Sequence, residues 1–213
     1  MNFDEFLISI SKIKNIPLPA ETSQFKMAPP FRKELLEKHK DAVKYAKKAG
    51  VLALFYPDKN QETNFVLILR KTYKGVHSAQ VSFPGGKLEA TDTSLEDAAL
   101  RETFEEVGVP ISDIKVVTPL TEVYIPPSNF YVQPFLGILD KKPSFKKEES
   151  EVEDIIEIPL KHFFSEDVTV LEKVATSYSV DVEVPAYFLN GHIVWGATAM
   201  ILSEVKDLLK QLM

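Results

Sequence analysis

The chain contains no cysteine among its 213 residues. This absence excludes disulfides, thiolate nucleophiles and every zinc or iron–sulfur site that depends on cysteine. It is compatible with a reducing compartment, so we expect a cytoplasmic protein. The histidines, at positions 39, 77, 162 and 192, show no paired spacing typical of metal ligands, which disfavours a histidine-based zinc site as well.

Long apolar runs and the features of a secretion signal are also lacking. The longest uncharged apolar stretch, residues 51–56, is far shorter than the ~20 residues that a membrane-spanning helix needs. Asp4 and Glu5 stand where a secretion signal would carry lysine or arginine. We therefore expect no membrane partner and no secretion signal.

The surface has no excess of positive charge. Lysine and arginine total 25 against 31 aspartates and glutamates, a formal net charge of -6. Such a surface repels nucleic acid, so we expect no nucleic-acid partner. If a small polyanion binds, metal ions or local basic residues must offset the negative field.

The chain is nevertheless long enough for one substantial core, with 45% hydrophobic residues. Residues 3–10 carry apolar side chains at helical spacing, and the composition of residues 31–49 favours a second helix that Gly50 would cap. Together they predict an N-terminal helical appendage, residues 1–49, before a main domain at residues 50–213. The appendage could cover a sheet edge, contact a second copy in a homodimer or gate a pocket.

The main domain alternates short β-type runs with a few helices. Strands are predicted at 51–56, 65–69, 114–123, 131–139, 168–174 and 178–189, and helices at 94–107 and 196–212. Residues 141–154, basic and then acidic, are expected to form a solvated loop or hairpin tip. The pattern predicts an α+β fold with a mixed sheet.

Residues 83–109 carry the chemistry. The turn Pro84-Gly85-Gly86 lets a ligand approach the backbone closely. A helix follows, for which Thr93 and Glu96 are spaced as a capping box. Gly108 is expected to end it.

Winding this helix at ~100° per residue predicts a buried stripe and an acidic face on the opposite side. The stripe consists of Leu100, Phe104 and Val107, and the acidic face of Glu102, Glu105 and Glu106. Neighbouring carboxylates repel each other, whereas a divalent cation such as Mg²⁺ or Mn²⁺ would bind them together. Arg101 can pair with Glu105 one turn on. An acidic triplet is also found on ordinary solvated helices, so both interpretations stay open.

The segment resembles the Nudix box, in which a glycine precedes Arg-Glu-apolar-x-Glu-Glu-x-Gly-apolar. The match comprises Arg101, Glu102, Glu105, Glu106, Gly108 and Val109, with Thr103 at the usually aliphatic position. Gly86 lies one residue further from Arg101 than in the general pattern, and Asp92 stands near the first glutamate position. Both features are typical of the coenzyme A pyrophosphatase branch of Nudix hydrolases.

The resemblance to that branch extends from Gly50 to the C-terminus. Upstream it includes residues 66–70 and 77–86, with Gly75 and Ala79 as departures from the branch pattern. Downstream it includes residues 134–137, 150–152, 158–160 and 193–199.

The resemblance implies an α/β/α sandwich and metal-dependent hydrolysis of a pyrophosphate bond in a small nucleoside diphosphate derivative. Coenzyme A or an acyl-CoA would give 3',5'-ADP and an (acyl) phosphopantetheine. The alternatives are ADP-ribose or a dinucleotide as substrate, or a Nudix-fold module that binds a ligand without hydrolysis.

The resemblance also implies roles for individual residues. Mg²⁺ or Mn²⁺ would be held by Glu102, Glu105, Glu106 and the backbone of Gly86, with Arg101 orienting the carboxylates. Glu151, in a Ser-Glu-Val element, is the candidate base outside the box, although a loop glutamate beside Glu149 and Glu153 is more often merely solvated.

The candidates for substrate binding come from the turn, two strand ends and a proline-containing loop. They are Arg70, His77, Phe83, Gly85, Gly86, Tyr124, Ser128 and Phe130. A surface salt bridge for Arg70, a capping role for His77 and an ordinary strand connection for the loop are the competing interpretations. Trp195 is expected in the core.

Overall fold

The computed structural model describes residues 1–72, 80–175 and 182–212. Its main sheet has eight strands in the order β3-β2-β1-β7-β5, with β4 on β1, β6 on β7 and β8 on β2. The strands are β1 (Lys47–Pro57), β2 (Thr63–Arg70), β3 (Val81–Ser82), β4 (Gly85–Lys87), β5 (Lys115–Pro119), β6 (Val123–Ile125), β7 (Phe130–Ile138) and β8 (Val152–Pro159). Strands β1 and β7 run parallel and the other pairs are antiparallel, so the sheet is mixed.

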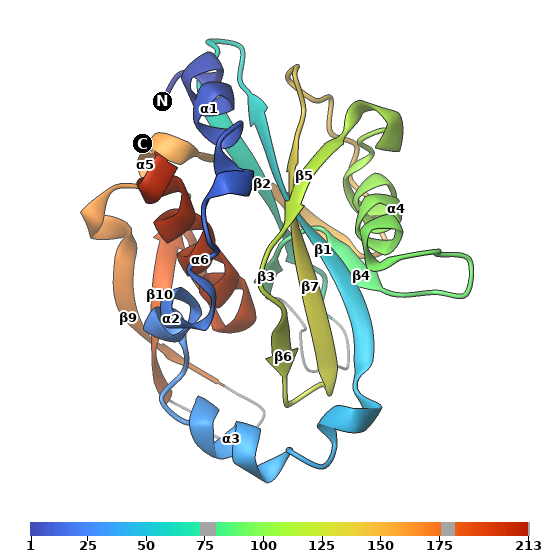
Figure 1. Ribbon diagram of the computed structural model, residues 1–213, viewed down its shortest axis with the longest axis vertical. Coiled ribbons are helices and arrows are strands. Elements are labelled where there is room, and N and C mark those ends of the chain that lie inside the picture. Colours follow the sequence, from blue (N-terminus) through green and yellow to red (C-terminus); the bar gives the residue numbers. More distant parts are fainter. Residues whose placement is uncertain (73–79, 176–181, 213) are drawn as a thin grey trace.

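The central strand β1 is buried on both faces of the sheet. Leu52, Leu54 and Tyr56 pack in the cluster that includes helix α4 (Leu95–Val107), whereas Ala53 and Phe55 pack in the cluster that includes helix α6 (Gly196–Leu212). Alternation of side chains along a strand sends successive residues to opposite faces. The two helices therefore lie on opposite sides of the sheet (Figure 1), and the predicted α+β fold with an α/β/α sandwich is confirmed.

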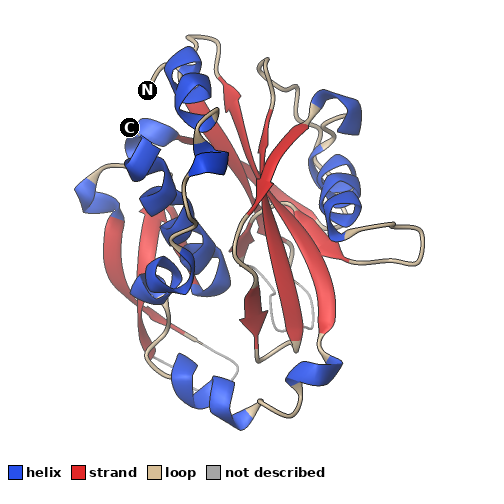
Figure 2. Ribbon diagram, viewed as in Figure 1, coloured by secondary structure: helices blue, strands red, loops and turns tan. Residues whose placement is uncertain are grey.

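A second, three-stranded sheet lies beyond α6, in the order β11-β10-β9. Its strands are β9 (Thr169–Val174), β10 (Val182–Leu189) and β11 (His192–Trp195), and the short helix α5 (Leu160–Phe163) precedes them. Figure 2 shows α6 between this sheet and the main one. Helix α6 begins directly after β11, with the bounds that the sequence predicted.

The N-terminal residues form the helices α1 (Phe3–Ile10), α2 (Ala20–Gln24) and α3 (Arg32–Lys38), with short 3-10 turns at 13–15, 25–27 and 43–45. Helix α1 is confirmed, and its buried side chains belong to the same core cluster as those of α6. Helix α2 contacts α6 directly, because Gln24 Nε2 donates to Glu204 Oε2 at 2.8 Å and Ser203 Oγ donates to the carbonyl of Ser23 at 2.7 Å.

The helix predicted over residues 31–49 is wrong beyond Lys38. Strand β1 already begins at Lys47, because that residue pairs in parallel with Phe130 on β7. Gly50 therefore does not cap a helix. It lies inside β1, where an added Cβ would come 2.0 Å from the carbonyl oxygen of Leu95, so its lack of a side chain lets α4 pack closely on the strand.

Two further predictions differ from the structure. The single strand predicted at 114–123 is divided, since β5 ends at Pro119 and β6 starts at Val123. Strand β8 begins at Val152, inside the segment predicted as a loop, because it pairs with β2 along its whole length. Among the helices of the described ranges, none combines the length and the apolar character that crossing a bilayer requires.

Candidate active site

The site begins where the glycine turn meets helix α4. Strand β4 pairs with β1, with Gly50 opposite Gly86 and Val51 opposite Gly85. Gly85 has φ +143°, and its added Cβ would come 2.4 Å from the carbonyl oxygen of Gly50. An added Cβ on Gly86 would come 2.3–2.5 Å from the carboxylate of Glu102. The two glycines therefore allow a tight turn and let an acidic side chain lie directly on the backbone.

Helix α4 has a defined cap at each end. The predicted cap at Thr93 is wrong, because the Oγ of Ser94 accepts a hydrogen bond from Asp97 N at 3.0 Å. Gly108 ends the helix in the left-handed conformation, φ 74°, as predicted. The segment before β8 lies against this end of the helix, where Lys146 N donates to the carbonyl of Val107.

The rotation of α4 differs in part from the predicted one. Val107 is buried as expected, but Phe104 is 50% exposed. Thr103 and Glu106 are buried instead, at 0% and 1% exposure. The helix lies so close to β1 over Gly50 that only small or hydrogen-bonded side chains fit between them, and Thr103 satisfies its hydroxyl by donating to the carbonyl of Ala99 at 2.6 Å.

Glu106 is the most enclosed carboxylate of the site. Its Oε2 accepts from Gly85 N at 2.8 Å and its Oε1 accepts from Arg70 Nη1 at 3.1 Å. Burial raises the pKa of Glu106 from its ordinary 4.5 to about 7, although the bond from Gly85 and the charge of Arg70 act in the opposite direction. The nearby charges of Glu102 and Glu151 add to the increase.

Arg101 gathers the remaining acidic groups. Its Nη1 donates to Glu105 at 2.8 Å, as predicted, and to Glu102 at 3.1 Å. Its Nε donates to Asp92 at 2.9 Å, which lowers the pKa of that carboxyl, and its Nη2 reaches the carbonyl of Lys87 at 3.1 Å. Burial raises the pKa of Glu102, against the influence of Arg101. The guanidinium thus fixes the orientation of the acidic side chains.

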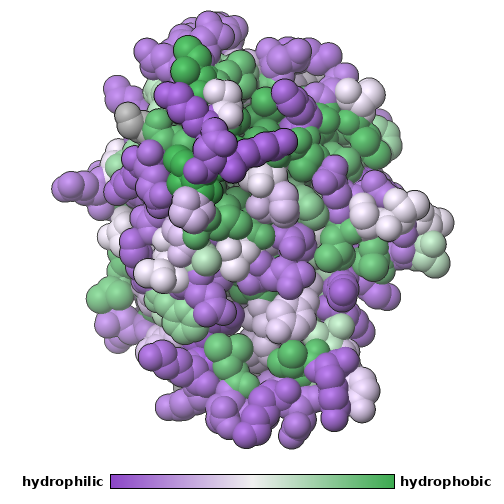
Figure 3. Space-filling view, in the orientation of Figure 1, coloured by the Kyte–Doolittle hydropathy of each residue, from purple (hydrophilic) through white to green (hydrophobic). Residues whose placement is uncertain are grey.

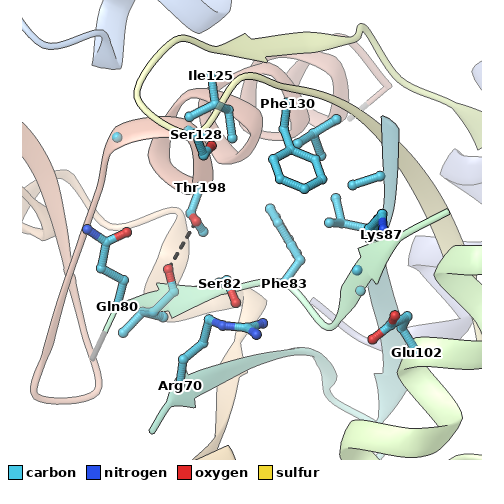
Figure 4. A pocket seen from close by; sticks show the side chains of 18 of the residues that line it. Arg70, Gln80, Ser82, Phe83, Lys87, Glu102, Ile125, Ser128, Phe130 and Thr198 are labelled. Carbon is cyan, nitrogen blue, oxygen red and sulfur yellow. Dashed lines mark hydrogen bonds between the residues drawn. The ribbon is translucent and has the colours of Figure 1, made fainter. Parts of the chain in front are cut away.

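These groups border a cavity of about 1340 Å³. The structure brings to it most of the residues predicted for the site: Arg70, Phe83, Gly85, Gly86, Arg101, Glu102, Glu105, Ser128, Phe130 and Glu151. In Figure 4, Arg70 and Glu102 lie on one side of the cavity, Ser128 and Phe130 lie on the opposite side, and Phe83 lies between them. Glu106 is buried behind the wall, in contact with Arg70 and Gly85.

Two predicted residues are not among these. His77 lies outside the described residues. Tyr124 is buried and does not line the cavity, because its ring packs on Tyr131 and its hydroxyl donates to Asn129 at 2.8 Å. The loop therefore contributes Ser128 and Phe130 to the wall, while Tyr124 supports it from behind.

Sequence reasoning missed part of the cavity wall. Phe31, Arg32 and Leu35 of the α3 region line it, together with Thr198 at the start of α6. Trp195, expected in the core, is only partly buried and also borders the cavity. No local pattern marks these residues, because they reach the site through contacts between segments far apart in the chain.

The acidic groups have the chemistry of a site for a hard divalent cation. Carboxylate oxygens are the ligands that Mg²⁺ and Mn²⁺ prefer, and the missing side chain of Gly86 leaves Glu102 lying against the backbone. Within the ranges that the structure describes, no three acidic or histidine side chains already form a metal-binding group, since Arg101 holds Glu102 and Glu105, and Arg70 holds Glu106. Burial disfavours the negative charge on Glu106, and a cation would stabilise that charge.

Comparisons with known proteins agree with this arrangement. Residues 46–175 match the model of the NUDIX domain. A protein of Pectobacterium atrosepticum described as an uncharacterized Nudix hydrolase NudL is 32% identical over 139 residues, 61% of this chain and 66% of its own length. A protein of Yersinia enterocolitica with the same description is 31% identical over 151 residues, 68% of this chain and 73% of its own length.

A solved structure shares the fold. The crystal structure of a Nudix hydrolase from M. smegmatis, RenU, superimposes with a TM-score of 0.54 at 13% identity, covering 78% of this chain and 87% of that one. The chain therefore belongs to the Nudix hydrolase family, as shown by the domain match and the curated relatives and in agreement with the carboxylate-bearing helix after a double-glycine turn.

Proposed function

We propose that the protein hydrolyses the pyrophosphate bond of coenzyme A or an acyl-CoA in a reaction that depends on Mg²⁺ or Mn²⁺, giving 3',5'-ADP and an (acyl) phosphopantetheine. Membership of the family supports the broader activity, hydrolysis of a nucleoside diphosphate derivative. The observation that carries the proposal is the group of box carboxylates gathered by Arg101 at the edge of a cavity of about 1340 Å³. That volume exceeds the ~300–1,000 Å³ of ordinary small-molecule pockets and suits a long substrate.

The metal would be held by Glu102, Glu105 and Glu106, with the backbone of Gly86 as a further ligand. A bound divalent cation supplies neutralisation of the phosphate oxygens and a lower pKa for the attacking water. Arg70, on the cavity wall and hydrogen-bonded to Glu106, adds positive charge for the diphosphate.

Glu151 is the proposed base. It lies on the cavity edge, where its charge contributes to the raised pKa of both Glu102 and Glu106. Its backbone carbonyl accepts from Lys71 N at 2.9 Å, which fixes the position of the main chain. An exposed carboxylate next to the cavity can accept the proton that water loses when it attacks phosphorus.

The choice of coenzyme A depends on the branch features of the sequence: the extra residue between Gly86 and Arg101, and Asp92. Asp92 has a structural role in the site. Its carboxylate accepts from Arg101 Nε at 2.9 Å and so holds the arginine that orients Glu102 and Glu105. ADP-ribose or a dinucleotide is the second candidate, since the aromatic cavity wall also suits any adenine nucleotide.

A substrate panel tests the proposal. Coenzyme A, acetyl-CoA, ADP-ribose and a diadenosine polyphosphate are incubated with Mg²⁺ or Mn²⁺ in ¹⁸O-labelled water, and the products are identified by mass spectrometry. We expect 3',5'-ADP from coenzyme A, and the position of the label identifies the phosphorus attacked. ADP-ribose cleaved far better than coenzyme A at equal concentration would reject the proposed substrate and keep the family activity.

Glu105→Gln tests the proposed metal role of this carboxylate. Glu105 is exposed on the cavity side of α4, so its loss removes a proposed metal ligand with little effect on the core. We expect turnover to fall roughly 100-fold or more, the scale at which lost electrostatic and metal-site groups act. Glu96→Gln, on an exposed position of the same helix away from the cavity, is the matched control and should keep full activity. Activity of Glu105→Gln equal to that of the control would reject the metal role of Glu105.

A further inference from the structure

The wall of the cavity contributed by the N-terminal segment is a feature that the family match does not include. Phe31, Arg32 and Leu35 line the cavity, yet all three precede residue 46, where the NUDIX match begins. The remaining side of α3 carries exposed charged residues such as Lys33 and Glu34, and the lower edge of the molecule, where α3 lies, is largely hydrophilic in Figure 3. The helix thus presents selected side chains to the cavity and the rest to solvent.

Arg32 is unusual among the arginines of the cavity. Arg70 and Arg101 both pair with carboxylates of the site. In the described part of the chain, no carboxylate lies within salt-bridge distance of Arg32, and Glu21 acts on it only through longer-range charge. Its charge is therefore available to an anion from outside the protein.

The surroundings hold the guanidinium in place without neutralising it. Nη2 donates to the carbonyl of Tyr124 at 2.9 Å, and the guanidinium carbon lies 5.9 Å from the ring centre of Phe25. Nε is buried and has no hydrogen-bond partner among the described residues. Burial lowers the pKa of Arg32, which means that the surroundings disfavour its charge. A partly buried guanidinium with unused donors is a strong site for a phosphate group.

The side chains around Arg32 indicate what carries that phosphate. Phe31, Ile125 and Phe130 line the same cavity, and Figure 4 shows Ile125 and Phe130 across the cavity from Arg70 and Glu102. Aromatic and apolar walls suit the face of a base. The proposed diphosphate site at α4 and the arginine at α3 therefore border one cavity from different segments.

We propose that Arg32 binds a phosphomonoester on the ribose of the nucleotide whose diphosphate is hydrolysed at α4. This inference rests on the proposed function, and it assigns to the N-terminal segment the selection of ribose-phosphorylated over plain adenine nucleotides. In coenzyme A the group is the 3'-phosphate. A 2'-phosphate has the same chemistry, and the experiment distinguishes the two.

Calorimetric titration of the full chain in Mg²⁺ with 5'-ADP, 3',5'-ADP and 2',5'-ADP tests the site without hydrolysis. Because a charge-assisted bond to phosphate is worth roughly ten- to hundredfold in affinity, we expect the wild type to bind one of the bisphosphates tighter than 5'-ADP by that factor. Arg32→Gln should remove the preference while 5'-ADP still binds. Lys33→Gln, the exposed neighbour on the same helix, should retain it.

Equal binding of all three nucleotides by the wild type, or a preference that survives in Arg32→Gln, would overturn the inference. If Arg32→Gln does not fold, Arg32→Met decides, because methionine keeps the apolar part of the side chain and removes the charge: a lost preference supports the site and a full one rejects it. The outcome is separable from the proposed function. A bisphosphate preference without hydrolysis of any panel compound would reject the proposed hydrolase activity and support the phosphate site at Arg32. Hydrolysis of coenzyme A without the preference would support the activity and reject the phosphate site.

Discussion

At the scale of single residues, the site depends on what is missing from two glycines. Gly50 and Gly86 are directly opposite each other on β1 and β4. A Cβ on Gly50 would meet the backbone oxygen of Leu95 at 2.0 Å, whereas one on Gly86 would meet the carboxylate of Glu102. The sequence showed that a double glycine precedes the helix, but only the packed structure shows that each position admits a different neighbour.

We therefore expect Gly50→Ala to reduce stability and Gly86→Ala to reduce activity. Gly50→Ala forces α4 away from the sheet and should lower the free energy of unfolding by about 1–3 kcal/mol or more. Gly86→Ala displaces only the end of a flexible side chain, so stability should change little while activity falls roughly 10–100-fold. Urea unfolding and a hydrolysis assay on both variants check this, and a Gly86→Ala protein with normal activity would refute the close contact with Glu102.

Glu106 gives a prediction on pH. Its pKa in the folded chain is raised to about 7 from 4.5, so between these values the folded state binds more protons than the unfolded state. Stability contributed by this group is therefore present at acidic pH and is lost as pH rises towards 7. In EDTA, the free energy of unfolding of the wild type relative to Glu106→Gln should fall between pH 5 and pH 8.

Urea unfolding of both proteins at the two pH values measures this difference. Added Mg²⁺ should restore part of the loss for the wild type at pH 8 and have less effect on the variant, because a cation stabilises the ionised carboxylate. A difference between the two proteins that is independent of pH would show that Glu106 stays ionised in the metal-free fold.

At the scale of elements, local patterns predicted the segments with clear apolar spacing and failed where strand pairing decides the structure. Helices α1 and α6 agree with their predicted positions, because each has a clear apolar periodicity and an identifiable end. The helical composition of residues 31–49 was misleading, since pairing of β1 with β7 extends the strand back to Lys47. Strand β8 was missed because acidic residues conceal the alternating buried positions Val152, Ile156 and Ile158.

The start of α4 illustrates the same limit and can be tested. Thr93 was the predicted cap, but the Oγ of Ser94 accepts from Asp97 N at 3.0 Å. Ser94→Ala should lower the free energy of unfolding by about 1 kcal/mol, the usual cost of a lost N-cap. Ser144→Ala, at an exposed position of the segment before β8, is the control. The melting temperatures of both variants are measured by thermal unfolding. Equal melting temperatures would show that Ser94 does not cap the helix and would favour Thr93.

At the scale of the whole molecule, the acidic segment and part of the cavity wall could be predicted, whereas the part of the wall built from α3 and α6 could not. Glu102, Glu105 and Arg101 lie within one short segment, so their spacing alone places them together. The unpredicted part of the wall is built from α3 and the start of α6, which are separated by more than half of the chain. Such a wall depends on how the N-terminal helices pack on α6, a contact that no local pattern encodes.

The same packing bears on whether residues 1–49 fold as a separate unit. The side chain of Phe6 is 0% exposed and its ring lies 5.0 Å from that of Phe55 on the central strand. Phe6→Ala should therefore cost ~3–5 kcal/mol, as for a phenylalanine in the middle of a domain, and unfolding should remain a single transition. Ile8→Ala, at a position of the same helix that is 63% exposed, should change stability by less than ~0.5 kcal/mol.

Urea unfolding followed by tryptophan fluorescence and circular dichroism measures both variants. Trp195 borders the cavity and reports on the region around the site, while circular dichroism reports on all helices. If the N-terminal helices share one core with the sheet, the two signals of Phe6→Ala should shift together to lower urea. An early transition seen only by circular dichroism, with the fluorescence transition at its wild-type midpoint, would show that the N-terminal residues unfold independently and form an appendage as the sequence suggested.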